Sequence, residues 1–499
     1  MWIWCFRIQL FLGCLGFVNA FKDSSLLPDL IESSGKKCWG YEKGCSFENS
    51  YSKDRLRCHK PSRWPSARTK EDQMNAFFDQ ADFGYVRQRM ESMQPICSSN
   101  RESGAFLECT DHLRFCRGRN ILFDFKSLNA KRSKRYRDDV IHEGEVGGDC
   151  DSFDKELLRK RSDEKSYLQS WGHELTNFES SSEYAVTDKN CDIIYERPTI
   201  LFKLDASVNM YHHFCDFINL FASQFINGTF NDDVDIVWWE THSTGYQDRY
   251  FGATWKAFSK HAPHELISLD QKRVCFRNVM FPLLARQRFG LYYNMPLIDG
   301  CEGSGLMHAF AHHLLDRLKI PQHGPLLGKL RITILSRSTL HRRINNVNEL
   351  LEILREIPNV EAQVVDYNEK VPFLKQLEIS HNSDIFIGMH GSGLTHMLFL
   401  PDWASVFEIY NCDDEHCYKD LARLRGVKYW TWTKMDKLHE EYEGRHPTDK
   451  TPHKKFTNYS FDKDEFLRIV LQMIEYVRRH PEFVKQQRIL RRRAAGAEL

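Results

Sequence analysis

The chain lacks a large excess of charge of either sign. Its 69 Lys and Arg residues nearly balance its 68 Asp and Glu residues, so net charge gives no indication of a nucleic-acid partner. After residue 20 it also lacks any apolar run of the roughly 20 residues that a membrane-spanning helix needs. It has neither the Walker lysine pattern nor a GxGxxG fingerprint, which argues against ATP hydrolysis and dinucleotide binding. We find no long tandem repeat.

What is present is typical of a globular protein. The apolar fraction is 41% and the aromatic fraction is 13%. A chain of 499 residues is long enough for two or three domains, because single cores stop growing near roughly 250–300 residues.

Residues 1–20 have the pattern of a cleaved secretory signal. One early basic residue, Arg7, precedes an apolar stretch that ends in Val18-Asn19-Ala20. A signal anchor is the alternative. The C-terminus, Gly-Ala-Glu-Leu499, shares only its last two residues with an endoplasmic reticulum retention signal.

Cysteine usage fits an oxidising compartment. Cys5 and Cys14 fall in the signal, which leaves an odd number, so most should pair and at least one thiol should stay free. The early cysteines predict a disulfide-stapled N-terminal region; they are Cys38, Cys45, Cys58, Cys97, Cys109 and Cys116. For Cys412 and Cys417 we favour a local disulfide over a metal site. The sequons at Asn227 and Asn458 predict glycosylation.

From about residue 199, predicted strands alternate with predicted helices. The strands lie at 200–204, 234–239, 274–284, 331–335, 360–365, 384–388, 405–409 and 428–432, and the helices at 211–225, 305–318, 347–357, 371–379, 394–400, 415–424 and 463–479. This alternation predicts an α/β fold with a doubly wound parallel sheet. Such sheets bind ligands at the carboxyl ends of their strands.

The segment IGMHGSGLTHMLFLP (387–401) joins a predicted strand to a predicted helix through a bare turn. The turn consists of His390, Gly391, Ser392 and Gly393, and the helix begins at Leu394. A helix N-terminus presents unpaired N–H groups, and glycines let an anion approach them, so a phosphate or diphosphate is the expected occupant. A tight turn capped by Ser392 is the alternative.

A second strand of the same sheet ends in an arginine-rich segment. Strand 331–335 runs into residues that include Arg337, Arg342 and Arg343, whose guanidinium forks match phosphate oxygens. Ordinary surface arginines are the alternative reading.

Polar residues share one face of the helix that follows strand 200–204. Asn209, His212 and Asp216 are spaced i, i+3 and i+7, and His213 lies beside them. An imidazole or a carboxylate that faces a cleft can take a proton from an acceptor hydroxyl. Capping and a buried structural network are the alternative.

Three further features are weaker. Glu408, late in strand 405–409, is a candidate for holding ribose hydroxyls, and Trp171 is a candidate acceptor-side residue, although a core aromatic is the better interpretation. His308 and His312 have the i, i+4 spacing of a metal pair, but no matching acid lies nearby in the sequence, so we favour an ordinary helix face.

Three motifs together resemble glycosyltransferase family 61. They are Asn-x-x-His-x-x-x-Asp at 209–216, Ser-Arg-x-x-x-x-Arg-Arg at 336–343 and His-Gly-Ser-Gly-Leu at 390–394. The cysteine-rich N-terminal region and the segments Glu-Ile-Tyr (408–410) and Tyr-Trp-Thr (429–431) strengthen the resemblance, which covers most of the chain from Cys38.

The resemblance implies two facing Rossmann-like domains of the GT-B type. It implies inverting transfer of N-acetylglucosamine from UDP-GlcNAc to Ser or Thr of a folded, secreted EGF-like repeat, in the endoplasmic reticulum lumen. Asp216 or His212 would be the base, with His213 a third candidate, and the turn at 390–394 and the three arginines would hold the diphosphate. We therefore expect a signal peptide (1–20), a cysteine-rich region partly packed on the first Rossmann-like domain (21–198), an acceptor-side domain (199–325), a nucleotide-sugar domain (326–435) and a helical extension (436–499).

We expect no essential metal, because arginines can neutralise the diphosphate. The candidate Asp-x-Asp segments, 149–151 and 233–235, do not lie at the carboxyl ends of strands. Three alternatives remain: another family 61 transferase that moves xylose or N-acetylglucosamine to a glycan, a non-catalytic luminal binding protein, and a hydrolase that uses Ser392. The nucleophile elbow Gly-x-Ser-x-Gly is absent at Ser392, which argues against hydrolysis.

Overall fold

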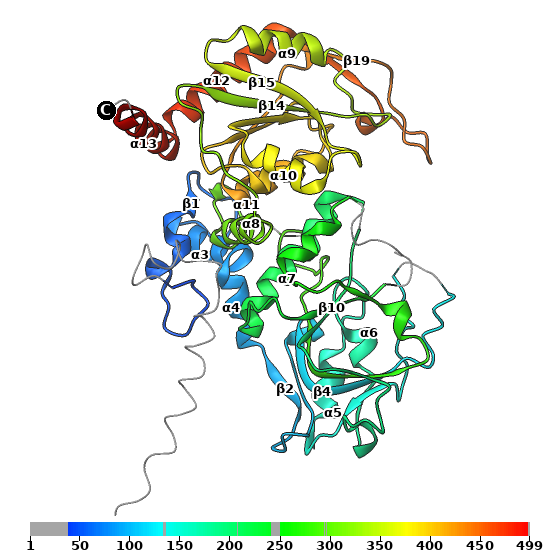
Figure 1. Cartoon of the computed structure of the whole chain (residues 1–499). Helices are drawn as coiled ribbons and strands as arrows, with labels where there is room; N and C mark the ends of the chain where they lie inside the picture. Colours follow the sequence, from blue (N-terminus) through cyan, green and yellow to red (C-terminus); the bar gives the residue numbers. More distant parts are fainter. Residues whose placement is uncertain are drawn as a thin grey trace, which may run out of the picture.

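The computed structural model describes residues 38–132, 136–206, 208–240, 250–293, 295 and 297–497. The predicted signal at 1–20 and the last two residues lie outside this range. Two sheet-containing halves are stacked, and helices fill the space between them (Figure 1). Within the described residues no helix has both the length and the apolarity to cross a membrane.

The C-terminal half contains a five-stranded sheet in which every strand pair is parallel. Its strands are β14 (Leu330–Ser336), β15 (Val360–Asp366), β16 (Ile385–Gly388), β17 (Ser405–Glu408) and β18 (Lys428–Thr431), in the spatial order β15-β14-β16-β17-β18. The connecting helices are α9 (Val347–Glu356), α10 (Phe373–His381), the 3-10 helix η8 (Ser392–Phe399) and α11 (Cys417–Arg425). The doubly wound parallel sheet predicted for this part of the chain is confirmed.

The central strands of this sheet are covered on both faces, which explains their unbroken apolar sequences. In β16, Phe386 packs into the core that lies between the two halves, whereas Ile385 and Ile387 pack into a separate core. That second core also takes Phe466 and Ile469 from α12 (Lys463–Arg479), a helix with the bounds predicted from the sequence.

The N-terminal half contains a mixed sheet of 11 strands that the sequence did not predict as one unit. Its strands are β2 (Gln94–Ser98), β3 (Phe106–Cys109), β4 (Cys116–Asp124), β5 (Val146–Gly148), β6 (Ser152–Phe153), β7 (Phe178–Ser180), β8 (Ile193–Tyr195), β9 (Thr199–Phe202), β10 (Asp235–Trp238), β11 (His264–Glu265) and β12 (Arg273–Phe281). β12 pairs antiparallel with β4 along its length and parallel with β8 and β9. The expected boundary between residues 198 and 199 therefore runs through a single continuous sheet.

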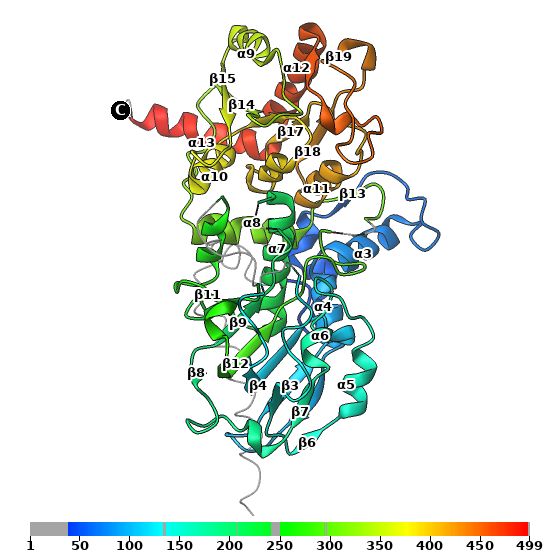
Figure 2. The same cartoon turned by 90° about the vertical axis from the view of Figure 1, so that its right-hand side faces the viewer.

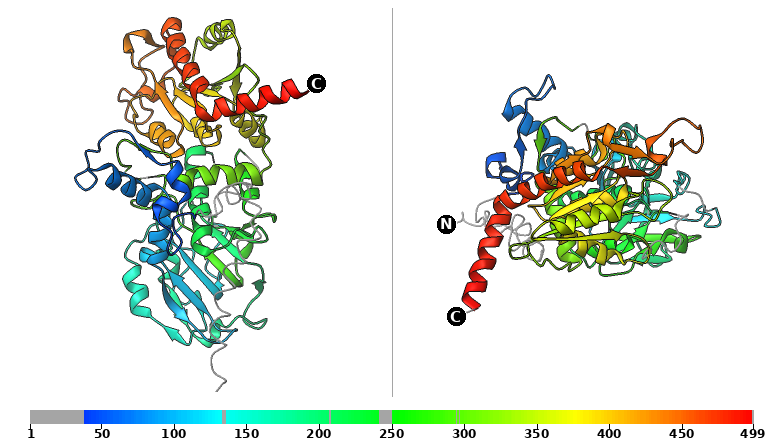
Figure 3. Two further views of the ribbon diagram at one scale, coloured as in Figure 1. Left: turned by 90° about the vertical axis from the view of Figure 1, so that its left-hand side faces the viewer. Right: turned by 90° about the horizontal axis from the view of Figure 1, so that it is seen from above.

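The remaining elements pack around these sheets and extend from them. They are η1 (Phe47–Asn49), η2 (Tyr51–Asp54), β1 (Arg57–Cys58), α3 (Lys70–Ala81), α4 (Phe83–Glu91), η3 (Asp111–Leu113), α5 (Lys155–Arg161), α6 (Gly172–Leu175), η4 (Ser182–Tyr184), α7 (Met210–Asn227), η6 (Gly252–Ala257), η7 (Leu266–Leu269), β13 (Cys301–Glu302), α8 (Gly305–Arg317), η9 (Met435–Lys437), β19 (Leu438–Glu440), η10 (Lys454–Phe456), β20 (Tyr459–Phe461) and α13 (Pro481–Ala497). The expected helical extension at 436–499 thus begins with the β19–β20 pair, and α13 projects from the body of the molecule (Figure 3).

The early cysteines are paired, as expected, but two of their bonds reach beyond the early cluster. The disulfides are Cys38–Cys45, Cys58–Cys301, Cys97–Cys150, Cys109–Cys116 and Cys191–Cys275. The bond between Cys58 and Cys301 attaches the N-terminal segment to the strand that precedes α8.

The disulfide predicted between Cys412 and Cys417 is wrong, because both thiols are free, as is that of Cys215. Cys412 lies in the core of the C-terminal half, and burial raises the pKa of its thiol to about 12. Cys417 begins α11 and is hydrogen-bonded to the side chain of Tyr211 in the N-terminal half.

Candidate functional site

The turn at Gly391 lies at the carboxyl end of β16, as the sequence predicts. The helix after it is a 3-10 helix that begins at Ser392, and its N-cap residue is Gly391 rather than Ser392. This removes the capped-turn alternative in its simple form. Gly393 is required for close packing, because a Cβ there would lie 2.5 Å from Leu335 of the neighbouring strand β14.

Two arginines converge on this turn. A Cβ added to Gly391 would overlap Nη1 of Arg337 and would lie 3.5 Å from Nη1 of Arg342. Arg342 Nη1 also donates to the carbonyl oxygen of His390 at 3.1 Å. Glycine thus leaves room for both guanidinium groups beside the turn, and any other residue would require Arg337 to move.

Neither guanidinium group is neutralised by the protein. Within the described residues no carboxylate forms an ion pair with Arg337 or Arg342, and the buried Nε of Arg342 has no hydrogen-bond partner. Burial and the neighbouring Arg342 lower the pKa of Arg337 to about 10. Two adjacent, partly buried cations without a counter-ion form a site for an anion with more than one charge.

Arg343, the third predicted clamp residue, is placed differently. It is exposed, and its backbone pairs with Asn458 and Tyr459 beside β20. The structure therefore brings together two of the three predicted arginines.

His390 is hydrogen-bonded to the carboxylate of Glu408. Nδ1 of His390 lies 2.8 Å from Oε1 of Glu408, whose other oxygen accepts from the hydroxyl of Tyr429 at 2.5 Å. Glu408 is fully buried, and burial raises the pKa of its carboxyl group while the His390 contact opposes that rise. Both carboxylate oxygens are thus engaged within the protein, so the expected ribose contact is replaced by a contact that orients His390.

The start of α7 separates the predicted base candidates. Asn209 is the N-cap of α7, and its Oδ1 accepts from the backbone N–H groups of Tyr211 and His212. Asp216 is 2% exposed and accepts from the backbone N–H of Asp205 at 2.8 Å, which fixes the loop after β9. The capping and buried-network interpretation therefore holds for these two residues.

His213 is also an internal residue. Its ring is fully buried and hydrogen-bonded to Thr254 at 2.9 Å, and burial lowers its pKa to about 3. A group that is buried and so weakly basic is unsuited to accept a proton from a substrate.

His212 is the candidate with the geometry of a general base. Its Nδ1 lies 2.7 Å from Oδ2 of Asp205, and its side chain is 25% exposed. Because an ionised carboxylate only accepts, Nδ1 carries the proton and Nε2 keeps its lone pair in the neutral ring. The described residues provide no hydrogen-bond partner for Nε2.

Asp205 and Arg286 are functional candidates that the sequence reading missed. Arg286 forms two hydrogen bonds to the Asp205 carboxylate, at 2.9 and 2.7 Å. Burial raises the pKa of Asp205, but the hydrogen bonds from His212 and Arg286 outweigh it and hold that pKa below its usual range. The sequence signal that could have identified Asp205 is its position, because it follows the carboxyl end of β9.

The His212 helix faces the His390 turn across the space between the two halves. The ring of Tyr211 lies 5.8 Å from that of Tyr418 on α11, and Tyr418 lies 5.1 Å from His390. α7 also packs against η8 through Phe214 and Phe399, at 5.2 Å. Figure 2, turned by 90° from Figure 1, also shows the start of α7 beside helices of the C-terminal half. A proton acceptor and an anion site thus face one another.

Trp171 belongs to the core of the N-terminal half. It is fully buried, its Nε1 donates to the carbonyl of Pro282, and it packs against Trp239 and Phe281. It cannot contact an acceptor without unfolding, so the acceptor-side role is not supported.

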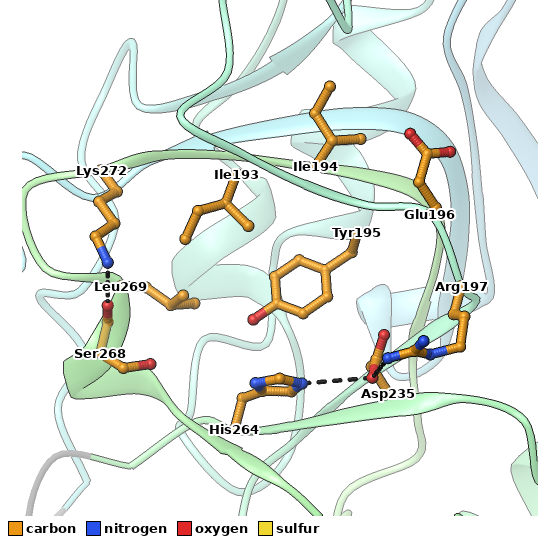
Figure 4. Close-up of a pocket in the computed structure, with 10 residues that line it drawn as sticks. All are labelled: Ile193, Ile194, Tyr195, Glu196, Arg197, Asp235, His264, Ser268, Leu269 and Lys272. Atoms are coloured by element: carbon orange, nitrogen blue, oxygen red, sulfur yellow. Dashed lines mark hydrogen bonds and ion pairs between the residues drawn. The ribbon is translucent and has the colours of Figure 1, made fainter. Parts of the chain in front are cut away.

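The Asp-x-Asp segments lie away from this site and have partners of their own. Asp149 and Asp151 both pair with Arg101. Asp235, at the amino end of β10, pairs with Arg197 and contacts His264. Asp235, Arg197 and His264 line a cavity of about 430 Å³, shown in Figure 4. This cavity lies at the end of the parallel strands opposite His212.

The two sequons differ in accessibility. Asn227 is the last residue of α7 and half-buried, which leaves its glycosylation as a prediction. Asn458 is 1% exposed, its amide nitrogen donates to Glu441, and its oxygen accepts from the N–H of Arg343. A glycan on Asn458 is therefore incompatible with the folded structure.

Comparison with known proteins places this site in a family. The glycosyltransferase 61 profile matches residues 210–407, from the start of α7 to β17. Two similar proteins, from Bos taurus and Drosophila melanogaster, are both named EGF domain-specific O-linked N-acetylglucosamine transferase. The bovine protein is 48% identical over 449 residues, which is 90% of this chain and 84% of that protein. The Drosophila protein is 44% identical over 479 residues, 94% of this chain and 90% of its own length.

One solved structure, the iron-containing dodecameric glycosyltransferase TibC of enterotoxigenic E. coli H10407, is 12% identical and covers 43% of this chain and 59% of its own. Its TM-score of 0.21 is too low to indicate a shared fold. The family assignment rests on the sequence relatives, which match at high identity over most of their length. The chain belongs to glycosyltransferase family 61.

Proposed function

We propose that this chain is an inverting glycosyltransferase that moves N-acetylglucosamine from UDP-GlcNAc to Ser or Thr hydroxyls of folded EGF-like repeats. The observation that carries the proposal is the 48% identity, over 90% of the chain, to a protein named as the EGF domain-specific O-linked N-acetylglucosamine transferase. The geometry supports it. Arg337 and Arg342, which have no carboxylate partner among the described residues, lie at a glycine turn and face His212, a partly exposed histidine held by a carboxylate.

The two halves divide the work in the manner of a GT-B enzyme. The parallel sheet of the C-terminal half takes the nucleotide sugar at the carboxyl ends of β14 and β16. The N-terminal half takes the acceptor at the start of α7, and the reaction occurs between them.

His212 removes the proton in this mechanism. The acceptor oxygen forms a bond to C1 of the sugar while the bond from C1 to the diphosphate oxygen breaks, and the proton of the hydroxyl passes to Nε2 of His212. Asp205, itself held by Arg286, orients the ring and stabilises the imidazolium that forms.

Arg337 and Arg342 stabilise the leaving UDP. The negative charge on the diphosphate grows as the sugar leaves, and fixed cations in a partly buried site stabilise that charge without reorganisation. The backbone N–H groups at the start of η8 add further donors, and Glu408 keeps His390 beside them.

The proposal includes a location in the endoplasmic reticulum lumen. Disulfides tie together much of the N-terminal half, and such bonds persist in oxidising compartments. The signal-like segment at 1–20 supports the same location.

The test is transfer by the purified chain from a panel of radiolabelled UDP-sugars to a folded EGF repeat. We expect label in the repeat from UDP-GlcNAc and little from the other donors. Hydrolysis or binding without transfer to a competent repeat would contradict the proposal.

Two controls separate the alternatives. A denatured repeat tests whether the acceptor must be folded, and an oligosaccharide panel tests a glycan acceptor. Transfer to the oligosaccharide in place of the repeat would identify the chain as a different family 61 transferase.

A further inference from the structure

A second group of polar side chains lies at the other end of η8 from the Gly391 turn. His308 and His312 occupy successive turns of α8, and their Nε2 atoms are 3.0 Å apart. Oδ2 of Asp402 lies 3.0 Å from Nε2 of His308, and the three ligand atoms all lie within 4.8 Å of one another. Two imidazole nitrogens and one carboxylate oxygen thus converge on one point.

The carboxylate of this group is distant from the histidines in the sequence and is brought to them by the fold. Asp402 follows η8 and the buried Pro401, and η8 packs directly against α8. The pair on α8 belongs to the N-terminal half and the carboxylate to the C-terminal half, so the group spans the junction between the halves.

The ligand atoms are oriented by further hydrogen bonds, as at protein metal sites. Nδ1 of His308 lies 2.7 Å from the hydroxyl of Tyr51, which turns Nε2 toward His312 and Asp402. Arg425 donates to Oδ1 of Asp402 at 2.9 Å, which leaves Oδ2 directed at the histidines.

Arg55 competes for Oδ2 of Asp402. It donates to the Tyr51 hydroxyl at 3.0 Å and reaches Oδ2 of Asp402 at 3.3 Å. The Arg55–Asp402 contact is long and its side chains are 29% and 32% exposed, so a divalent cation bound at Oδ2 would displace it at small cost.

We propose that His308, His312 and Asp402 bind a single Zn²⁺ ion that joins α8 to the C-terminal half. Zn²⁺ holds nitrogen and carboxylate ligands at about 2.0–2.2 Å in a tetrahedron, which separates the ligand atoms by roughly 3.3 Å, close to the two separations of 3.0 Å that His308 makes with Asp402 and His312. Two imidazoles and a carboxylate are a ligand set that suits this ion. His312 is exposed, which gives the ion access and leaves a fourth position for water.

The ion would act on stability and not on the chemistry of transfer. The eight residues of η8 separate this group from the Gly391 turn, about 16 Å at the rise of a 3-10 helix. A cation at this distance cannot contact the diphosphate, so the arginine clamp remains the anion site.

Zinc content and thermal stability of the full purified chain test the proposal. The chain is stripped with a chelator, equilibrated with two equivalents of Zn²⁺ and desalted, and its zinc is measured by mass spectrometry. We expect about one zinc per chain and, at saturating Zn²⁺, a Tm higher by about 5 °C.

His312→Ala is the decisive variant, because its exposed side chain can be removed without loss of core packing. It should retain less than a fifth of the wild-type zinc, show no Zn²⁺-dependent rise in Tm, and keep the zinc-free Tm of the wild type. His323→Ala removes another exposed histidine with a carboxylate neighbour, Glu378, and should behave as the wild type.

His312→Gln provides a second variant if the alanine variant does not fold. The proposal is overturned if the wild-type chain, after stripping, equilibration with Zn²⁺ and desalting, retains no zinc. It is equally overturned if the folded His312 variants retain as much zinc as the wild type.

Discussion

The two large sheets among the described residues, one in each half, are stabilised in different ways. The N-terminal sheet is mixed and joins segments that are far apart in sequence, and the half that contains it has all the disulfides found in the described residues. Cys58 and Cys301 are separated by 243 positions. The C-terminal sheet consists of consecutive parallel βα units, and its cysteines, Cys412 and Cys417, are free. Three of the five described disulfides join residues 53 to 243 positions apart, so covalent links reinforce the half in which distant segments must be held together.

The chemistry is divided along the same line. The N-terminal half contributes a histidine whose partners are already in place, Asp205 and Arg286. The C-terminal half contributes Arg337 and Arg342, cations that have no counter-ion among the described residues. The first arrangement suits proton transfer and the second suits binding of a ligand that supplies the missing charge.

The largest effect should follow removal of the proton acceptor from the N-terminal half. We expect His212→Ala to lower kcat by about 10³-fold, with the KM for UDP-GlcNAc nearly unchanged, because general bases contribute about 10²–10⁴-fold. Steady-state kinetics with a folded EGF repeat measures both parameters.

His261→Ala is the matched control for His212→Ala. His261 also pairs with an aspartate at 2.7 Å, Asp233, but it lies at the opposite end of the strands. Equal loss of activity in both variants would remove His212 from the mechanism.

The next effect concerns the disulfides of the N-terminal sheet. Replacing both Cys191 and Cys275 with serine should cost about 2–5 kcal/mol of unfolding free energy, because the bond closes a loop of 84 residues. Denaturant unfolding measures this cost. The control is Cys417→Ser, which breaks no disulfide and should cost less than about 1 kcal/mol. If it lost as much unfolding free energy as the Cys191/Cys275 double variant, the contrast between the halves would be contradicted.

A smaller loss of activity is expected from the C-terminal arginine pair. Arg337→Ala should lower kcat/KM for UDP-GlcNAc by about 10²-fold, the usual cost of removing one preorganised donor. Arg343→Ala is the control, since Arg343 is exposed, and should stay within about twofold of the wild type. Undiminished transfer by Arg337→Ala would exclude the clamp.

The smallest effect should come from the residue that orients His390. Glu408→Gln leaves the shape but removes the charge that faces Nδ1 of His390, which should lower kcat/KM about tenfold. Steady-state kinetics with a folded EGF repeat measures this loss. A kcat/KM equal to that of the wild type would remove the Glu408–His390 contact from the mechanism.

The C-terminal half could be predicted from sequence because its information is local. Each strand is a short apolar run followed by a helix pattern, as in Asp384-Ile-Phe-Ile-Gly388 and the segment after it. Parallel βα units pair with near neighbours in the chain, so the pattern of one unit defines its place in the sheet.

The N-terminal half could not be predicted in the same way. The pairing of β12 with β4 joins residues about 150 positions apart, and no local pattern encodes it. The same limit applies to the sites. Spacing correctly placed His212 on the polar side of α7, but the cap role of Asn209, the internal role of Asp216 and the contribution of Asp402 to the α8 histidines depend on contacts made only in the fold.

The most direct test of the divided site is the affinity for UDP of three proteins measured side by side: the wild type, His212→Ala and Arg337→Ala. Isothermal titration calorimetry should give the same Kd for the wild type and His212→Ala, and a Kd about 30-fold to 100-fold weaker for Arg337→Ala, as expected for loss of a charge-assisted contact. Unchanged UDP binding in Arg337→Ala, or equal weakening in both variants, would contradict the division of base and anion site between the two halves.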